Sequence, residues 1–107
     1  MNFIRQNAEN PFYLRVNCNA LHSPFEGYLS ELMDFYDNCP FKACPQEVAH
    51  PWATANFRRH LGNRESLKGY FSAITNMDHN IGRLIDLIEH LGLRETTVFV
   101  FSSDNGY

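Results

Sequence analysis

One long apolar pattern constrains the fold of this chain more than any other feature of its sequence. Large apolar residues recur at alternating intervals of three and four positions, which places them on one face of an α-helix of about seven turns: Leu67, Tyr70, Ile74, Met77, Ile81, Leu84, Ile88 and Leu91. A side-chain oxygen of Asn63 or Ser66 can cap the start. Gly92 suits the position after the end, and Leu93 can supply the apolar contact that follows such a glycine. The pattern predicts a helix over residues 66–91.

Two positions inside this helix call for a structural explanation. Gly82 costs up to about 1 kcal/mol relative to Ala in a helix interior, so we expect a close packing partner there. Lys68 falls between apolar positions and can be a charge on the helix surface. Shortly before the helix, Arg58 and Arg59 form a basic pair, which is typical of a solvated face, and His60 follows them.

Two shorter segments on either side of the helix have the pattern of β-strands. Residues 12–18 alternate apolar and polar side chains, and residues 97–102 begin with an apolar run typical of a strand buried in a parallel sheet. Residues 22–65 form a long insertion, with short helical stretches at about 27–36 and 53–61. The order of strand, insertion, helix and strand predicts a right-handed βαβ crossover in an α/β fold.

Size and composition exclude several classes of protein. At 107 residues the chain is at most one domain. Its net charge of −3 argues against nucleic-acid binding, which needs a basic surface. No apolar run approaches the roughly 20 residues of a membrane span, and residues 1–10 lack the apolar core of a signal peptide. Because one βαβ unit buries little surface, we expect a fragment of a larger domain or a truncated product.

The polar residues that follow the predicted strands are the candidate site. His22 comes after the first strand, and Asp104 and Asn105 come after the second. Ligands bind beyond the carboxyl ends of parallel strands, so these residues are expected to face one crevice. Carboxylate and amide oxygens suit a hard cation such as Ca²⁺ or Mg²⁺, although a simple Asp-Asn-Gly turn explains the same residues. His22 can donate a proton to a leaving group or bind an anion, or it is an ordinary loop histidine.

Several segments together resemble the sulfatase family of the alkaline-phosphatase-like superfamily. They are GYFSAITNMDHNIGRL at 69–84, LGL at 91–93 and TVFVFSSDNG at 97–106, with PFYL at 11–14 and NALHSP at 19–24 upstream. The resemblance implies that residues 1–107 are part of a sulfatase catalytic domain. It also implies the fold class: α/β, the βαβ portion of an alkaline-phosphatase-like, mostly parallel sheet flanked by helices.

The resemblance also implies roles for individual residues. Asp104 and Asn105 match metal ligands, for Ca²⁺ more than Mg²⁺, and His22 matches the histidine that contacts the sulfate and protonates the leaving alcohol. The substrate would be a sulfate ester, and the reaction its hydrolysis to an alcohol and sulfate. The family's nucleophile is the hydrate of a formylglycine, which is made from Cys or Ser in the motif Cys/Ser-x-Pro-x-Arg.

That nucleophile motif is absent from this sequence. None of Cys18, Cys39 and Cys44 stands in it, and the paired aspartates that complete the family's metal shell are also missing. A disulfide between Cys39 and Cys44 in an oxidising compartment stays open. The isolated chain is therefore expected to be inactive. The alternatives are a phosphonate monoester hydrolase or phosphodiesterase of the same superfamily, and a non-catalytic α/β interaction module that would melt cooperatively by itself.

Overall fold

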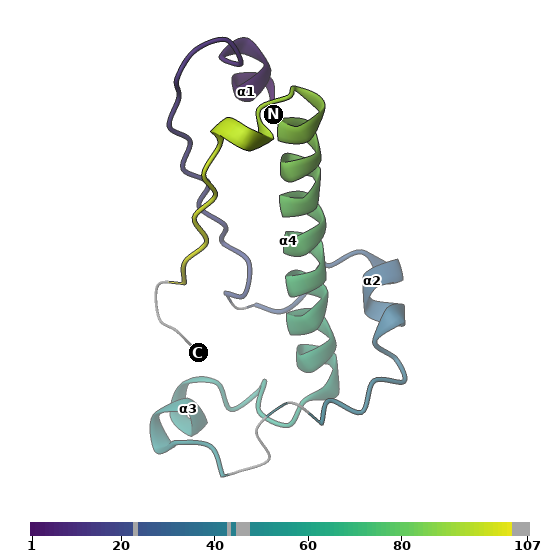
Figure 1. Cartoon of the computed structure of the whole chain (residues 1–107). Coiled ribbons are helices and arrows are strands. Elements are labelled where there is room, and N and C mark those ends of the chain that lie inside the picture. The colour runs from purple at the N-terminus through teal and green to yellow at the C-terminus, as the bar shows by residue number, and fades with distance from the viewer. Residues whose placement is uncertain (23, 43, 45–47, 104–107) are drawn as a thin grey trace. The chain divides into compact units, whose positions relative to one another are not determined.

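A computed structural model describes residues 1–22, 24–42, 44 and 48–103 of the chain. The elements of this described part are helices (Figure 1): α1 (Asn2–Gln6), α2 (Ser30–Phe35), α3 (Pro51–Asn56), α4 (Arg64–His90) and the 3-10 helix η1 (Arg94–Thr96). The chain divides into two compact units, one of residues 1–16 with the chain from 80 onward, the other of residues 17–79. None of the described helices is long and apolar enough to cross a membrane.

The predicted βαβ portion of an alkaline-phosphatase-like parallel sheet is wrong for this structure, because no β-strand occurs in its described residues. The two segments predicted as strands, 12–18 and 97–102, are not β-strands within that described part. Tyr13 is 85% exposed, and Val98 and Val100 are each 87% exposed. A strand is stabilised by a hydrogen-bonded neighbour and by packing on its faces. β-Propensity without those partners yields only an extended segment.

The predicted long helix is present as α4. Its N-terminus is capped by one of the two candidate residues, Asn63 and Ser66. The Oδ1 atom of Asn63 accepts hydrogen bonds from the backbone N–H groups of Glu65 (2.9 Å) and Ser66 (3.2 Å). Both N–H groups would otherwise lack a partner within the helix. Asn63, rather than Ser66, is therefore the capping residue.

Replacing Asn63 with Ala is expected to lower the free energy of unfolding by about 0.5–2 kcal/mol, because both N–H groups lose their acceptor. Asn63→Asp keeps an oxygen acceptor and places a negative charge at the helix N-terminus, so it should retain most of the stability. Urea unfolding of the three proteins measures the difference. An equal loss in both variants would show that Asn63 acts through something other than its side-chain oxygen.

The end of α4 has the predicted glycine and leucine in a Schellman motif. Gly92 has a φ of 69°, its N–H donates to the carbonyl oxygen of Glu89 (2.9 Å), and the N–H of Leu93 donates to that of Ile88 (3.0 Å). These are the two hydrogen bonds that define the motif. Leu93 also packs against the buried cluster that contains Ile88. The local sequence, Gly92 followed by Leu93, therefore determines where the helix ends.

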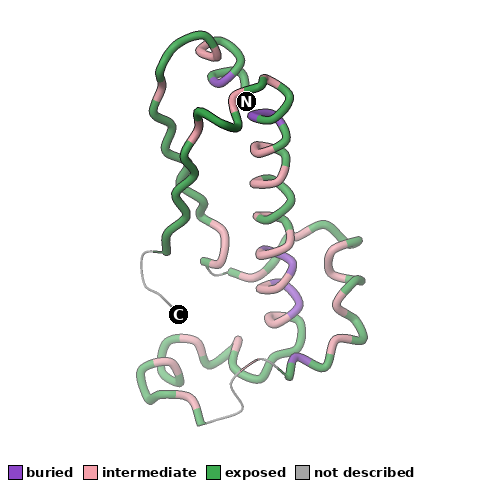
Figure 2. The backbone as a smooth tube through the Cα atoms, in the orientation of Figure 1, coloured by how far each residue is buried: buried purple, intermediate pink, exposed green. Residues whose placement is uncertain are grey.

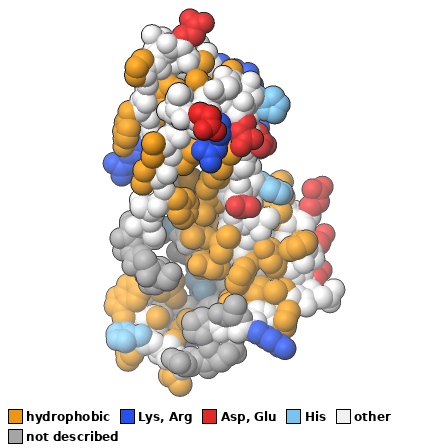
Figure 3. All heavy atoms as spheres, viewed as in Figure 1, with side chains coloured by type: hydrophobic (Ala, Val, Ile, Leu, Met, Phe, Trp, Pro, Cys, Tyr) orange, Lys and Arg blue, Asp and Glu red, His pale blue; other side chains and the backbone are white. Residues whose placement is uncertain are grey.

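The first unit has a small core where α1 packs on the end of α4. Ile4, Leu87 and Ile88 are buried there, and Phe12, Leu84, Leu91 and Leu93 pack around them. Figure 2 shows the buried positions of α4 in two groups, one within residues 68–73 and one at 87–88. Of the eight residues of the predicted apolar face, Ile88 is buried and the other seven are half-buried. Hydrophobic side chains accordingly remain visible over much of the face drawn in Figure 3.

The second unit is held together by aromatic contacts between α4 and the segments before it. The ring of Phe71 lies 5.2 Å from that of Phe41 and 5.6 Å from that of Tyr36. The hydroxyl of Tyr36 is hydrogen-bonded to that of Thr75 at 2.7 Å. Phe41 is buried although its φ of 47° is unusual for a side-chain-bearing residue. Packing at this cluster offsets the backbone strain.

The close approach predicted at Gly82 occurs instead at Gly69. Apart from its chain neighbours and the adjoining helix backbone, no described atom lies within 4 Å of a Cβ built at Gly82. A Cβ at Gly69 would lie 2.9 Å from the carbonyl carbon of Phe25 and closer still to its oxygen. A loop distant in sequence crosses α4 at Gly69, and helical periodicity carries no information about where a distant loop crosses. The sequence therefore predicted the right kind of contact at the wrong glycine.

Candidate functional site

His22 lies exposed in the irregular segment that precedes α2. The residue before it, Leu21, has a φ of 75°, in the left-handed region that leucine rarely adopts. Strained backbone of this kind persists only where the surrounding structure holds it, and it concentrates at functional sites. The turn at Leu21 is thus a second reason to regard His22 as a candidate, and its role stays a prediction.

The two predicted metal ligands, Asp104 and Asn105, lie outside the described residues. Within the described ranges, no group of three or more His, Cys, Asp or Glu side chains could hold a metal ion. One carboxylate and one amide oxygen suit Ca²⁺ in kind, but its shell takes six to eight oxygens. The described residues contain no cluster of this kind, and the metal-binding role of Asp104 and Asn105 stays a prediction.

The disulfide between Cys39 and Cys44 that the sequence left open is not formed. Cys39 and Cys44 are both half-buried thiols, and Cys18 is exposed. The three cysteines therefore add no covalent constraint to this structure.

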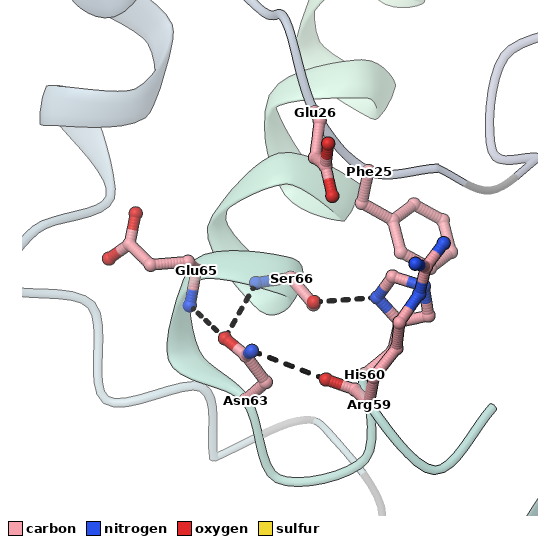
Figure 4. Close-up of a pocket in the computed structure, with 7 residues that line it drawn as sticks. All are labelled: Phe25, Glu26, Arg59, His60, Asn63, Glu65 and Ser66. Carbon is pink, nitrogen blue, oxygen red and sulfur yellow. Dashed lines mark hydrogen bonds between the residues drawn. The ribbon is translucent and has the colours of Figure 1, made fainter.

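A pocket of about 200 Å³ lies in the unit of residues 17–79 (Figure 4). We call it the Arg59 pocket and define it by its lining residues: Phe25, Glu26, Arg59, His60, Asn63, Glu65 and Ser66. They come from three segments: the one just after His22, the loop between α3 and α4, and the first turn of α4. In Figure 4 the Glu65 carboxylate points away from the other side chains, and it lies 3.4 Å from the amino group of Lys68.

Hydrogen bonds on both ring nitrogens hold the imidazole of His60 in this pocket. The Nε–H of Arg59 donates to Nε2 of His60 at 3.1 Å, and Nδ1 of His60 lies 2.8 Å from the hydroxyl oxygen of Ser66. An arginine nitrogen can only donate, so Nε2 carries no proton and Nδ1 carries it. In this arrangement His60 donates from Nδ1 to the hydroxyl oxygen of Ser66. It does not accept the hydroxyl proton, as the base of a serine nucleophile would.

Sequence reasoning missed this pocket. Arg59 was expected on a solvated face as half of a basic pair, and His60 had no assigned role. The only local signal was the cap at Asn63, which fixes where α4 begins. That Phe25 would join the pocket depends on a contact between segments about 40 residues apart, which a local pattern cannot indicate.

Lys68 and Arg64 tie the chain after α2 to the start of α4. The amino group of Lys68 lies 2.5 Å from a carboxylate oxygen of Asp37. Lys68 is buried, so it is not the surface charge that its position in the sequence allowed. Arg64 donates to the carbonyl oxygens of Asp37 and of Cys39 (3.1 Å), and its guanidinium lies 5.2 Å from the centre of the Phe41 ring. These contacts position the first turn of α4, which lines the Arg59 pocket.

The ion pair between Lys68 and Asp37 predicts that the protein loses stability at alkaline pH. The hydrogen bond that Lys68 donates to the Asp37 carboxylate raises the pKa of Lys68 above its ordinary 10.5, although burial opposes the rise. A lysine whose pKa is higher in the folded state than in the unfolded state stabilises the fold. This stabilisation is fully present below the pKa of the unfolded state and is lost as the pH rises through the pKa of the folded state. We expect the urea midpoint to fall as the pH rises above 10.5, and to fall less in Lys68→Met. Lys42→Met, at an exposed lysine, is the control and should keep the wild-type slope. Identical slopes for wild type and Lys68→Met would contradict this expectation.

Comparisons with known proteins agree on one family. A family model described as Sulfatase matches residues 1–107. An endo-4-O-sulfatase of Bacteroides thetaiotaomicron is 29% identical, over 94% of this chain and 19% of the relative. An arylsulfatase of Clostridium perfringens is 27% identical, over 95% of this chain and 23% of the relative. An N-acetylglucosamine-6-O-sulfatase of B. thetaiotaomicron is 30% identical, over 63% of this chain and 15% of the relative. The chain thus spans between 15% and 23% of the length of these relatives. No solved structure matches it significantly.

Proposed function

This chain belongs to the sulfatase family, whose general reaction is the hydrolysis of sulfate esters, and from that membership we propose that it forms part of a catalytic domain that cleaves sulfate esters to an alcohol and sulfate. The observation that carries the proposal is the family match over residues 1–107, together with the relatives that align along most of the chain. Because the chain spans about a fifth of the endo-4-O-sulfatase, the activity of a complete protein is part of the proposal.

We assign His22 the role of proton donor to the leaving group. In this role its imidazole contacts the sulfate and gives a proton to the departing alcohol oxygen, so that a neutral alcohol leaves. The exposure of His22 and the strained turn at Leu21 support the assignment, since a proton donor must be reachable by substrate and held in position. Asp104 and Asn105 are proposed to bind a divalent cation, Ca²⁺ rather than Mg²⁺. When bound, such an ion would neutralise charge on the sulfate oxygens.

The nucleophile is proposed to come from outside these residues. Cys18, Cys39 and Cys44 all lack the Pro and Arg that the formylglycine motif requires at fixed spacing. The isolated chain should therefore release no sulfate from an aryl sulfate.

The proposal can be tested by placing residues 1–107 in the arylsulfatase of C. perfringens, in exchange for the segment that aligns with them. The chimera supplies a nucleophile that the isolated chain lacks. We expect the chimera to release sulfate from an aryl sulfate or a carbohydrate sulfate, and the isolated chain to release none. A chimera that keeps the cooperative melt of its host but releases no sulfate would overturn the proposal. So would hydrolysis of a phosphonate monoester in place of a sulfate ester, or turnover by the isolated chain.

A further inference from the structure

We propose that the Arg59 pocket binds a neutral sugar ring through neighbouring hydroxyl groups. Three polar groups at this pocket retain unused hydrogen-bonding capacity: the terminal nitrogens of Arg59, the carboxylate of Glu26 and the hydroxyl proton of Ser66. Among the interactions of the described residues, Arg59 uses only its Nε and backbone carbonyl, and Glu26 makes no ion pair. The pocket therefore presents donors and an acceptor to a ligand.

The charge of the pocket favours a neutral ligand over an ion. One guanidinium and one carboxylate remain, because the Glu65 carboxylate is paired with Lys68. A free anion would be attracted by Arg59 and repelled by Glu26, and a cation would meet the reverse. A pair of adjacent hydroxyls satisfies both groups, since each hydroxyl can accept from the guanidinium or Ser66 and donate to the carboxylate.

The apolar wall of the pocket is a rigidly held aromatic ring. The edge contacts of Phe25 are with His60, at 5.3 Å between ring centres, and with Tyr70, at 5.7 Å. A sugar ring has an apolar face of C–H groups that can pack on such a surface. At about 200 Å³, the pocket is smaller than the roughly 300–1,000 Å³ typical of sites for drug-sized ligands, so it suits a single ring.

The pocket also lies close along the chain to the proposed proton donor. Phe25 and Glu26 follow His22 by three and four residues, within the same compact unit. A fully extended chain covers at most about 3.6 Å per residue, so the Cα atoms of His22 and Glu26 are at most about 14 Å apart. A sugar in the pocket would lie near a sulfate ester presented to His22. This link rests on the proposed function, whereas the binding of a neutral sugar does not.

The experiment is an NMR titration of the ¹⁵N-labelled full chain with galactose, glucose and N-acetylglucosamine, and separately with sodium sulfate. We expect at least one sugar to cause saturable shifts of the amides of Phe25, His60 and Ser66, and sulfate to cause none there. Arg59→Met should weaken sugar binding by about tenfold or more, because hydrogen bonds to a charged group are lost. Arg58→Met removes the neighbouring arginine, which does not line the Arg59 pocket, and should leave binding unchanged.

A second pair of variants covers the case in which Arg59→Met disturbs the loop. Glu26→Gln removes the acceptor charge and should also weaken binding, whereas Glu31→Gln, on α2, should not. The proposal is overturned if no sugar gives saturable shifts at the pocket, if sulfate binds there in place of sugar, or if both members of a variant pair bind equally well. Sulfate hydrolysis is not measured in this titration, so a negative result leaves the proposed function standing.

Discussion

Replacing His22 with Ala in the arylsulfatase chimera is expected to lower kcat for sulfate-ester hydrolysis by about 10²–10⁴-fold, the usual contribution of a positioned general acid. The loss should depend on the leaving group. An alkyl or sugar alcohol leaves poorly without a proton, so it should show the larger loss. An aryl alcohol leaves more readily as an anion, so it should show the smaller one. Steady-state kinetics with one ester of each kind measure both losses.

His79→Ala is the matched control for this prediction. His79 is an exposed histidine on α4, outside the lining of the Arg59 pocket, and its loss should leave kcat unchanged. Thermal melts of both variants exclude a difference in folding. Equal losses for the two esters in His22→Ala would contradict a proton-donating role, because a residue that only holds the turn would affect both alike.

Gly69→Ala is expected to destabilise the protein by about 1–3 kcal/mol, the usual cost of forcing extra volume into a packed site. Its Cβ would meet the backbone of Phe25, which cannot rotate away as a flexible side chain can. The segment carrying Phe25 would have to move, and the edge contact between Phe25 and Tyr70 would open. Because Phe25 also lines the Arg59 pocket, Gly69→Ala should disturb the amide signals of His60 and Ser66 as well.

Gly82→Ala is the paired substitution in the same helix. No described atom would touch its Cβ, so only helix propensity changes, and stability should rise by up to about 1 kcal/mol. Urea unfolding of the two variants should therefore give shifts of opposite sign. A gain in both would mean that α4 is not in close contact with Phe25.

The features predicted correctly from the sequence are those that depend on local order. The apolar spacing predicted a helix over residues 66–91, and the capping chemistry of Asn63 and Gly92 fixed its ends within two residues. The resemblance to the sulfatase family is likewise confirmed, because it rests on the order of several motifs along the chain.

Features that depend on distant partners were predicted poorly. Residues 97–102 have the composition of a buried strand, but composition cannot supply a neighbour, and within the described residues none pairs with them. The Arg59 pocket depends on Phe25 reaching a helix that begins at Arg64. The shared crevice of His22 and Asp104 stays a prediction, because Asp104 lies outside the described residues.

α4 contributes to both compact units, residues 64–79 to one and residues 80–90 to the other. A helix forms cooperatively, since each new turn extends hydrogen bonds already made. Loss of order in one unit is therefore transmitted to the other through a shared ladder of backbone hydrogen bonds. Gly82 lies three positions past the division and has the weakest helix propensity of its neighbourhood. It is the point at which this energetic coupling is most easily interrupted.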